Sequence, residues 1–161
     1  MNTCERYYGT SIASVRGDRP FPPRECGGVD FYFETEILVR GRRNNVALIV
    51  GIGLCGEFVD MSDGFPGWLA MAPSTGYHGD DGLMHDFELI HPNSTPRPFG
   101  AGDTVGCGID WDQGCVYYTK NGECVGRIKT PMIRRKCYPV VSMRKSPCMV
   151  KVVSDICLYK A

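Results

Sequence analysis

The densest group of side chains able to do chemistry is a polar cluster near the middle of the chain. Its members are His78, Asp80, Asp81, His85 and Asp86. Imidazole and carboxylate groups this close together could hold a metal ion or act as a general acid and base. The structural alternative is that Gly79-Asp-Asp-Gly82 forms a tight turn whose carboxylates cap backbone N–H groups. Because no nucleophile–base pair accompanies the cluster, we favour the turn and predict no catalytic residue, no metal site and no cofactor.

A glycine-rich run, Gly51-Ile-Gly-Leu-Cys-Gly56, fits the G-x-G-x-x-G pattern of dinucleotide-binding loops. That site requires a helix directly afterwards, because the helix N-terminus holds the pyrophosphate. Here Gly64, Pro66 and Gly67 exclude a helix in the stretch that follows, so we reject nucleotide binding. We expect the glycines to allow close packing of a strand against the sheet instead.

Nine cysteines are many for a chain of 161 residues, but no two of them have the C-x-x-C spacing typical of zinc fingers and thioredoxin-like sites. The odd count also argues against a secreted disulfide scaffold. We therefore expect mostly free, buried thiols in a reducing compartment. That compartment is the cytoplasm alone or the cytoplasm together with the nucleus. The first ten residues carry Glu5 and Arg6 and lack the apolar core of a signal peptide. A secreted form stays open, because a mature secreted protein would show no signal peptide.

The composition indicates one globular domain covering residues 1–161. Hydrophobic residues make up 43% and charged residues 22%, which excludes a disordered chain. Acidic and basic residues number 18 each, so no global charge excess directs the protein toward nucleic acid or an anionic membrane. The longest uncharged apolar run, residues 46–55, is about half the length of a membrane span. We predict no membrane segment.

Glycine and proline divide the chain into short pieces, several of which alternate between apolar and polar residues. Residues 31–39 form one such piece, with Phe31, Phe33 and Ile37 on one face. Residues 46–54 are nearly all apolar, as expected for a strand covered on both faces. Residues 138–143 and 149–153 are predicted to form a final strand pair. The pattern indicates an all-β sandwich of antiparallel strands.

Residues 103–128 predict a three-stranded meander. The turn signals are residues 111–114 and Asn121-Gly122, a pair that favours a type I′ hairpin turn. If residue 110 pairs with 115 and residue 120 with 123, one register sorts the apolar residues onto one face. The resulting opposed pairs are Ile109 with Val116, Cys107 with Tyr118, Tyr118 with Val125, and Cys115 with Ile128.

Basic residues are concentrated late in the chain, where no acidic residue occurs between Cys124 and Ser154. They are Arg127, Lys129, Arg134, Arg135, Lys136, Arg144, Lys145 and Lys151. One interpretation is an ordinary solvated face. The other is an electropositive patch that binds an acidic peptide or a nucleic acid.

Short motifs spread over nearly the whole chain occur in the order seen in one known family. They are Val15-Arg16, Pro20-Phe-Pro-Pro-Arg-Glu-Cys-Gly27, Phe31-Tyr-Phe-Glu34, Gly51-Ile-Gly-Leu54, Pro66-Gly-Trp68, Gly76-Tyr-His-Gly-Asp-Asp-Gly82, Phe99-Gly-Ala-Gly-Asp103, Val105-Gly-Cys-Gly-Ile-Asp110, Tyr118-Thr-Lys-Asn-Gly122 and Tyr138-Pro-Val-Val141. Together these motifs resemble a SPRY domain, and most closely the SPRY domains of Ran-binding protein M and its relatives.

The resemblance implies a bent sandwich of two antiparallel sheets that is not an enzyme. Loops at one edge of such domains form a shallow pocket for a short extended peptide of a partner protein. By this resemblance Tyr77 lines the pocket, and Arg144, Lys145 and Ser146 form another wall. That wall is apolar and aromatic in relatives but cationic here, so we expect a ligand containing Asp, Glu or phosphate. The domain is expected to be monomeric, and Ran-binding protein M resembles a scaffold subunit of a ubiquitin ligase.

The chain also departs from this family pattern. The stretch from Trp68 to Tyr77, which includes Met71, is longer and more apolar than usual. Trp68 and Met71 are therefore either a second contact surface beside the pocket or inward packing. The part before Val15 is shorter than in relatives, and the segments that follow the SPRY domain in Ran-binding protein M are absent. The chain is thus a piece of a longer protein or a free-standing SPRY protein. The alternative function is binding of nucleic acid or another polyanion through residues 127–151.

Overall fold

The computed structural model describes residues 12–21, 31–39, 49–62, 64–68, 71–87, 89–90, 95–144 and 148–153. These ranges contain β1 (Ile12–Arg16), β2 (Phe31–Val39), β3 (Ile49–Gly56), β4 (Ser74–His78), β5 (Met84–Asp86), β6 (Leu89–Ile90), β7 (Thr104–Asp110), β8 (Cys115–Lys120), β9 (Glu123–Ile128), the short 3-10 helix η3 (Pro131–Arg134), β10 (Cys137–Arg144) and β11 (Cys148–Val153). In the described part of the chain, no helix has the length and apolar character needed to cross a membrane.

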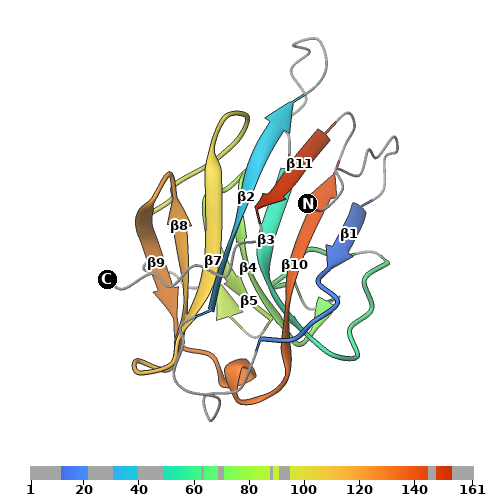
Figure 1. The fold of residues 1–161 in the computed structure, drawn as a ribbon, viewed down its shortest axis with the longest axis vertical. Coiled ribbons are helices and arrows are strands. Elements are labelled where there is room, and N and C mark those ends of the chain that lie inside the picture. The colour runs from blue at the N-terminus through green and yellow to red at the C-terminus, as the bar shows by residue number, and fades with distance from the viewer. Residues whose placement is uncertain are drawn as a thin grey trace.

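The strands form two antiparallel sheets that face each other (Figure 1). The first has six strands in the order β1-β10-β3-β4-β5-β6, and the second has five in the order β11-β2-β7-β8-β9. The predicted all-β sandwich is confirmed. The prediction worked because most strands alternate with period two, and this pattern buries one face of each sheet.

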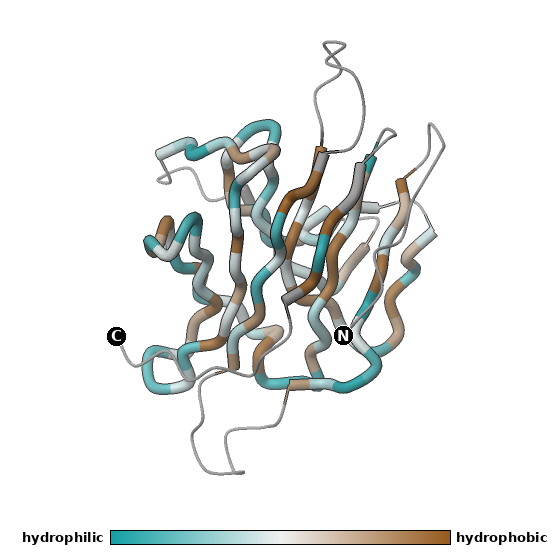
Figure 2. Tube along the Cα trace, turned by 45° about the horizontal axis from the view of Figure 1, so that its top comes forward, coloured by the Kyte–Doolittle hydropathy of each residue, from teal (hydrophilic) through white to brown (hydrophobic). Residues whose placement is uncertain are grey.

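The main core lies between the two sheets and is built from alternate residues of each strand. Phe33, Thr35 and Ile37 point inward from β2, as the alternation predicts. Val50, Ile52 and Leu54 point inward from β3, although the residues between them are also buried. β3 is therefore covered on both faces, as its apolar run indicates. Apolar residues are concentrated along the strands and polar residues at the turns (Figure 2).

The meander of β7, β8 and β9 follows the predicted register between β7 and β8 and, next to the turn, between β8 and β9, where Lys120 pairs with Glu123. Ile109 pairs with Val116 and Cys107 with Tyr118, as predicted. A β-bulge between Tyr118 and Thr119 then shifts the pairing of β8 with β9. Tyr118 therefore faces Gly126 rather than Val125, and Val116, not Cys115, faces Ile128. The bulge sets two residues of one strand against one of the other, which alternation alone does not reveal.

β10 and β11 both form, but the prediction that they pair with each other is wrong. β10 lies between β1 and β3 in the first sheet, whereas β11 pairs with β2 in the second. Val141 and Met143 of β10 and Val150 of β11 all enter the common core. From opposite layers these side chains can pack against one another across the core, which a hairpin within one sheet would not permit.

Loops lie at two opposite ends of the sandwich. We name them the Arg144 end, after the last residue of β10, and the Lys136 end, after the residue that precedes β10. The Arg144 end carries residues 79–83, 95–103 and 121–122. The Lys136 end carries residues 17–21, 57–62, 111–114 and 129–136. Because β10 has 8 residues and a strand rises about 3.3 Å per residue, the two ends lie about 25 Å apart.

Candidate functional site

Tyr77, the predicted pocket residue, lies inside the sandwich. Its side chain is 1% exposed and packs against Phe99 and Tyr118, with ring centroids 4.8 and 5.8 Å away. Burial raises the pKa of the Tyr77 hydroxyl to about 12, so the group stays protonated at neutral pH. In this structure Tyr77 therefore offers no side-chain surface to a ligand.

The hydroxyl of Tyr77 instead supports a loop. It donates a hydrogen bond to the backbone carbonyl of Arg97. The same loop is held by the N–H of Arg97 on the carbonyl of Gly82 at 2.9 Å, and by the N–H of Phe99 on that of Gly79 at 3.0 Å. Residues 95–98 are nevertheless exposed to solvent. The buried Tyr77 thus helps to hold the exposed residues 95–98 in place through its hydroxyl group.

Arg144 lies on the other face of the six-stranded sheet. Val141 pairs with Ile52, which pairs with Tyr77, and all three point into the core. Since successive side chains alternate, Arg144, three positions after Val141, points to the outer face. The side chains of Tyr77 and Arg144 are therefore not two walls of one pocket in this structure. Lys145 and Ser146 lie outside the described residues.

Trp68 and Met71 lie between β3 and β4, where the structure describes residues 57–62, 64–68 and 71–73. These residues lie on the outer face of the six-stranded sheet, and we call them the covering segment. Met71 is fully buried in a small cluster with Cys55, Tyr138 and Val140. The sequence left open whether Met71 forms a contact surface or packs inward, and in the structure it packs inward. Trp68 is 38% exposed, and its ring packs on Phe65 with centroids 5.2 Å apart. Trp68 is the member of this pair that a partner can reach.

Glycines on the sheet allow this covering segment to approach closely. A methyl group on Gly51 would lie 2.7 Å from a ring carbon of Phe65. A methyl group on Gly76 would overlap the carbonyl oxygen of Pro66. As expected, the glycine-rich run allows close packing against the sheet. The part of the chain that packs there is the covering segment.

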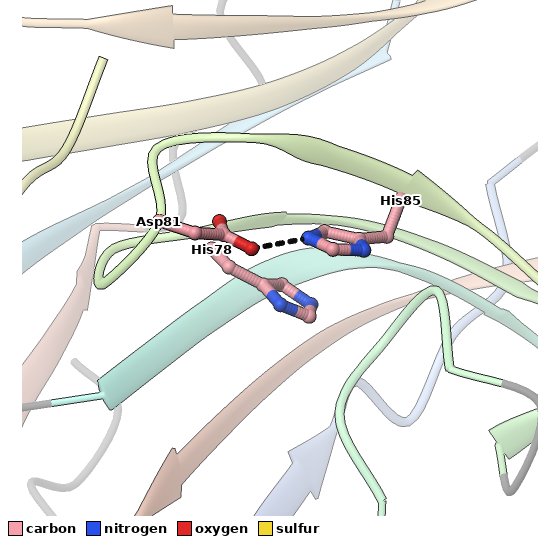
Figure 3. A group of neighbouring side chains, drawn as sticks. All are labelled: His78, Asp81 and His85. Atoms are coloured by element: carbon pink, nitrogen blue, oxygen red, sulfur yellow. Dashed lines mark hydrogen bonds and ion pairs between the residues drawn. The ribbon is translucent and has the colours of Figure 1, made fainter. Parts of the chain in front are cut away.

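Three members of the polar cluster, His78, Asp81 and His85, lie side by side, and Asp81 is bonded to His85 (Figure 3). Asp81 accepts a hydrogen bond from the N–H of Leu83 at 2.8 Å, so its carboxylate caps the turn as predicted. Its other oxygen lies 2.8 Å from Nε2 of His85. Nε2 of His78 lies 2.7 Å from the carbonyl oxygen of Pro66 and donates to it. The cluster thereby ties the covering segment to the sheet.

A metal ion does not fit this cluster as it stands. One ligand atom from each of His78, Asp81 and His85 lies within 4.8 Å of the others. However, the two imidazole rings stack with centroids 4.1 Å apart and planes at 20°. A metal lies in the plane of each imidazole that binds it. Because the two rings are stacked and nearly parallel, one ion cannot lie close to both ring planes at binding distance. The geometry therefore favours a structural turn over a metal site.

Acidification is expected to destabilise the domain through His78. Burial, assisted by the neighbouring His85, lowers the pKa of His78 from 6.5 to about 4. The unfolded chain therefore binds a proton at a higher pH than the folded chain does. The free energy of unfolding should fall by about 3 kcal/mol as the pH drops from 7 to 4 through this group alone.

The measurement is urea unfolding of the wild type and of His78→Gln at a series of pH values. Glutamine keeps an N–H donor for the carbonyl of Pro66 but does not titrate, and every other titrating group is common to both proteins. The variant should show the shallower pH dependence. Equal slopes would contradict this role of His78.

The predicted basic residues do not form one patch. Arg127 on β9 and Lys151 on β11 lie at opposite edges of the five-stranded sheet. Arg127 pairs with Asp110 at 3.1 Å, Lys136 with Glu57 at 3.5 Å, and Lys151 with Glu36 at 3.8 Å. Within the described ranges, no carboxylate pairs with Lys129, Arg134 or Arg135. These three residues are exposed and lie at the Lys136 end.

The cysteines whose side chains the structure describes are free at five positions, and four of the five are buried. Cys55, Cys107, Cys115 and Cys137 are buried, whereas Cys124 is exposed. Burial raises the pKa of Cys55 to about 11 and that of Cys137 to about 12. These two thiols are therefore not nucleophilic at neutral pH.

Comparison with known proteins shows similarity to one family. A model of the SPRY domain matches residues 30–155. Ran-binding protein 9 of Xenopus tropicalis is 38% identical over 136 residues, which covers 82% of this chain and 22% of that protein. Ran-binding protein 10 of Danio rerio is 37% identical over 136 residues, again 82% of this chain but 20% of the relative. The chain thus spans about a fifth of the length of these relatives.

Solved structures are similar over nearly the full chain. A crystal structure of a human SPRY domain superposes with a TM-score of 0.71 at 25% identity, covering 94% of this chain and 92% of that one. The SPRY domain of human HERC1 gives a TM-score of 0.66 at 15% identity, covering 92% and 86%. The second similarity concerns the fold alone.

Proposed function

Because this chain belongs to the SPRY domain family, whose members are in general protein-interaction modules, we propose that it binds a short extended segment of a partner protein through loops at the Arg144 end. The domain supplies recognition and no catalysis. In a larger assembly, such as a ubiquitin ligase, it would act as a scaffold or substrate-recognition part.

The observation that carries this proposal is the exposed but fixed segment 95–98. Its sequence is Thr-Pro-Arg-Pro, and two prolines restrict its backbone. The hydroxyl of Tyr77 and the N–H groups of Arg97 and Phe99 hold it against the turn at residues 79–82. A surface ordered before binding loses little conformational entropy when a peptide docks. Modest contacts can then give useful affinity.

The charge at this end supports an acidic or phosphorylated ligand. Arg144 is half-buried at the end of β10, and Lys145 follows it in the sequence. Arg97 is 49% exposed, and its ion pair with Glu123 at 3.0 Å is open to solvent. A carboxylate or phosphate of a partner can compete for such an exposed pair, because water screens it strongly. Trp68, on the same sheet face as Arg144, adds accessible aromatic area.

Charge reversal at the two ends tests this proposal. A peptide-display selection on the immobilised domain provides binding sequences, and Arg144→Glu/Lys145→Glu is the test variant. The matched control, Arg134→Glu/Arg135→Glu, changes the same charge about 25 Å away. We expect at least one enriched motif containing Asp, Glu or phosphoresidues that binds about tenfold more weakly to the test variant and equally well to the control. Unchanged binding of every selected motif to the test variant would contradict the proposal.

A second candidate function is binding of nucleic acid or another polyanion at the Lys136 end. Lys129, Arg134 and Arg135, which lack a carboxylate partner among the described residues, favour it. In that case the control variant above would lose binding to single-stranded oligonucleotides, and affinity would fall steeply with salt. Failure of wild-type protein to bind oligonucleotides at low salt would exclude it.

A further inference from the structure

The covering segment holds one aromatic ring in solvent. Phe58, two residues after β3, is 93% exposed, far more than the other exposed large apolar residues, Val15 at 40% and Trp68 at 38%. A single exposed apolar residue is ordinary on a protein surface, so what distinguishes Phe58 is how its loop is anchored and which charges lie beside it. Phe58 has no role in the Arg144 end, because it lies at the opposite end of β3.

The backbone on both sides of Phe58 is anchored, so its exposure is a fixed property of the loop. The guanidinium of Arg16 donates to the carbonyl of Glu57 at 2.6 Å. After Phe58, Val59 and Met61 pack against the small cluster that contains Met71. The neighbours of Phe58 are thus held down while its ring points away from the protein.

Two cations contact the residue before Phe58, and two more lie in the neighbouring loop. Arg16 stacks over the ring of Tyr138 at 4.5 Å, and its hydrogen-bond partner is a neutral carbonyl, so its charge is not neutralised. Lys136 reaches Glu57, the residue before Phe58, at 3.5 Å. Arg134 and Arg135 precede Lys136 and are exposed at the end of η3.

The loop that carries these cations is also fixed. Thr130 caps the start of η3 through its side chain, accepting from the N–H of Met132 at 3.3 Å. The thiol of Cys137 donates to the carbonyl of Met132 at 3.1 Å. Of the two acidic residues beside Phe58, Glu57 pairs with Lys136, whereas Asp60 accepts from the neutral N–H of Ser62 at 2.9 Å and keeps its charge. Positive charge is still in excess among the described residues at this end of the sandwich, where the basic residues are Arg16, Arg19, Lys129, Arg134, Arg135 and Lys136 and the acidic ones are Asp18, Glu57, Asp60 and Asp112.

We propose that Phe58, with Arg134 and Arg135, forms a second binding surface for an acidic polypeptide segment that carries an apolar side chain. The apolar side chain of the partner covers the ring of Phe58, and its carboxylates face the two arginines. Aromatic residues and arginine are the side chains most often decisive at protein interfaces. This surface goes beyond the proposed function, because it is separate from the Arg144 end and does not require it.

A peptide fits this surface better than a lipid membrane does. Glu57 and Asp60 flank Phe58 on either side, and both would face an anionic lipid surface if the ring were inserted. A peptide can place its carboxylates opposite the arginines and avoid these two acids. The mixed charge therefore favours a polypeptide partner.

The test selects peptides from a display library on the wild-type domain and measures their affinity for Phe58→Ser, Arg134→Glu/Arg135→Glu and Val15→Ser, the last being a matched control at another exposed apolar residue. We expect a set of acidic–apolar peptides that bind about tenfold more weakly to the first two variants and equally well to Val15→Ser. Phe58→Ser should keep the thermal midpoint of the wild type, because the ring makes little contact with the protein.

Two results would overturn this proposal. One is the absence of any selected peptide whose affinity depends on Phe58, with the variant shown to be folded. The other is Phe58-dependent binding to phosphatidylserine vesicles in place of peptides. Peptides sensitive to Arg144→Glu/Lys145→Glu would still report on the Arg144 end, so the two proposals fail separately.

Discussion

Replacing Gly76 with alanine is expected to destabilise the domain by about 3 kcal/mol, since inserting even one methyl group into a closed packing forces the backbone to shift. The added methyl group would overlap the carbonyl oxygen of Pro66 and lie 2.8 Å from its carbonyl carbon. Both atoms belong to the backbone of the covering segment, so no side-chain rotation relieves the contact. The segment that carries Trp68 and buries Met71 would have to lift from the sheet.

Gly100→Ala is the matched control for this substitution. A methyl group on Gly100 meets no atom within 4 Å, so alanine should leave the stability nearly unchanged. Urea unfolding of both variants gives the two free energies directly. A Gly76→Ala protein within about 1 kcal/mol of the wild type would show that the covering segment does not lie on the sheet as described.

Tyr77→Ala is expected to cost about 4 kcal/mol of stability, in the range found when large core side chains are truncated. The Tyr77 ring fills the space between Phe99 and Tyr118, and alanine would leave a cavity there. Tyr77→Phe keeps the ring and removes only the hydroxyl that donates to Arg97, so its expected cost is about 1 kcal/mol. Thermal or urea unfolding of the pair separates packing from the hydrogen bond.

The same pair clarifies how Tyr77 relates to binding. If Tyr77 acts by supporting residues 95–98, Tyr77→Phe should weaken peptide binding modestly while the domain stays folded. If the residue contacted the peptide directly, Tyr77→Ala would lose binding with little loss of stability. A stable Tyr77→Ala protein would therefore contradict the buried position described here.

Local patterns were enough to predict the sheets and part of their pairing. The turn at residues 111–114 fixes how β7 meets β8, so the pairs Ile109–Val116 and Cys107–Tyr118 follow from alternation. The bulge at Tyr118 could not be predicted, because alternation assumes one residue against one. β10 and β11 belong to different sheets because of how their side chains pack across the core. The alternation within each strand does not show which sheet the strand joins.

Side-chain placement was the harder part of the candidate site. Tyr77 is apolar enough to suit either a pocket wall or a core, and only the register assigns it to the core. The basic residues between 127 and 151 share one part of the sequence, but β9, β10 and β11 place them at different edges and ends of the sandwich. The exposure of Phe58 was not predicted. Its neighbours Val59 and Met61 are also apolar, and the sequence does not show that those two are packed while Phe58 is exposed.

The most direct test of the central claim, that a partner peptide docks on the loops of the Arg144 end, is an NMR titration of the isotope-labelled domain. The titrant is a peptide whose selection depended on Arg144 and Lys145. We predict that the shifted amide signals fall in residues 79–83, 95–98 and 121–122 and at Arg144, while the inward-facing strand residues stay unchanged. Shifts centred on η3 and Arg127, with residues 79–83 and 95–98 unperturbed, would contradict the account.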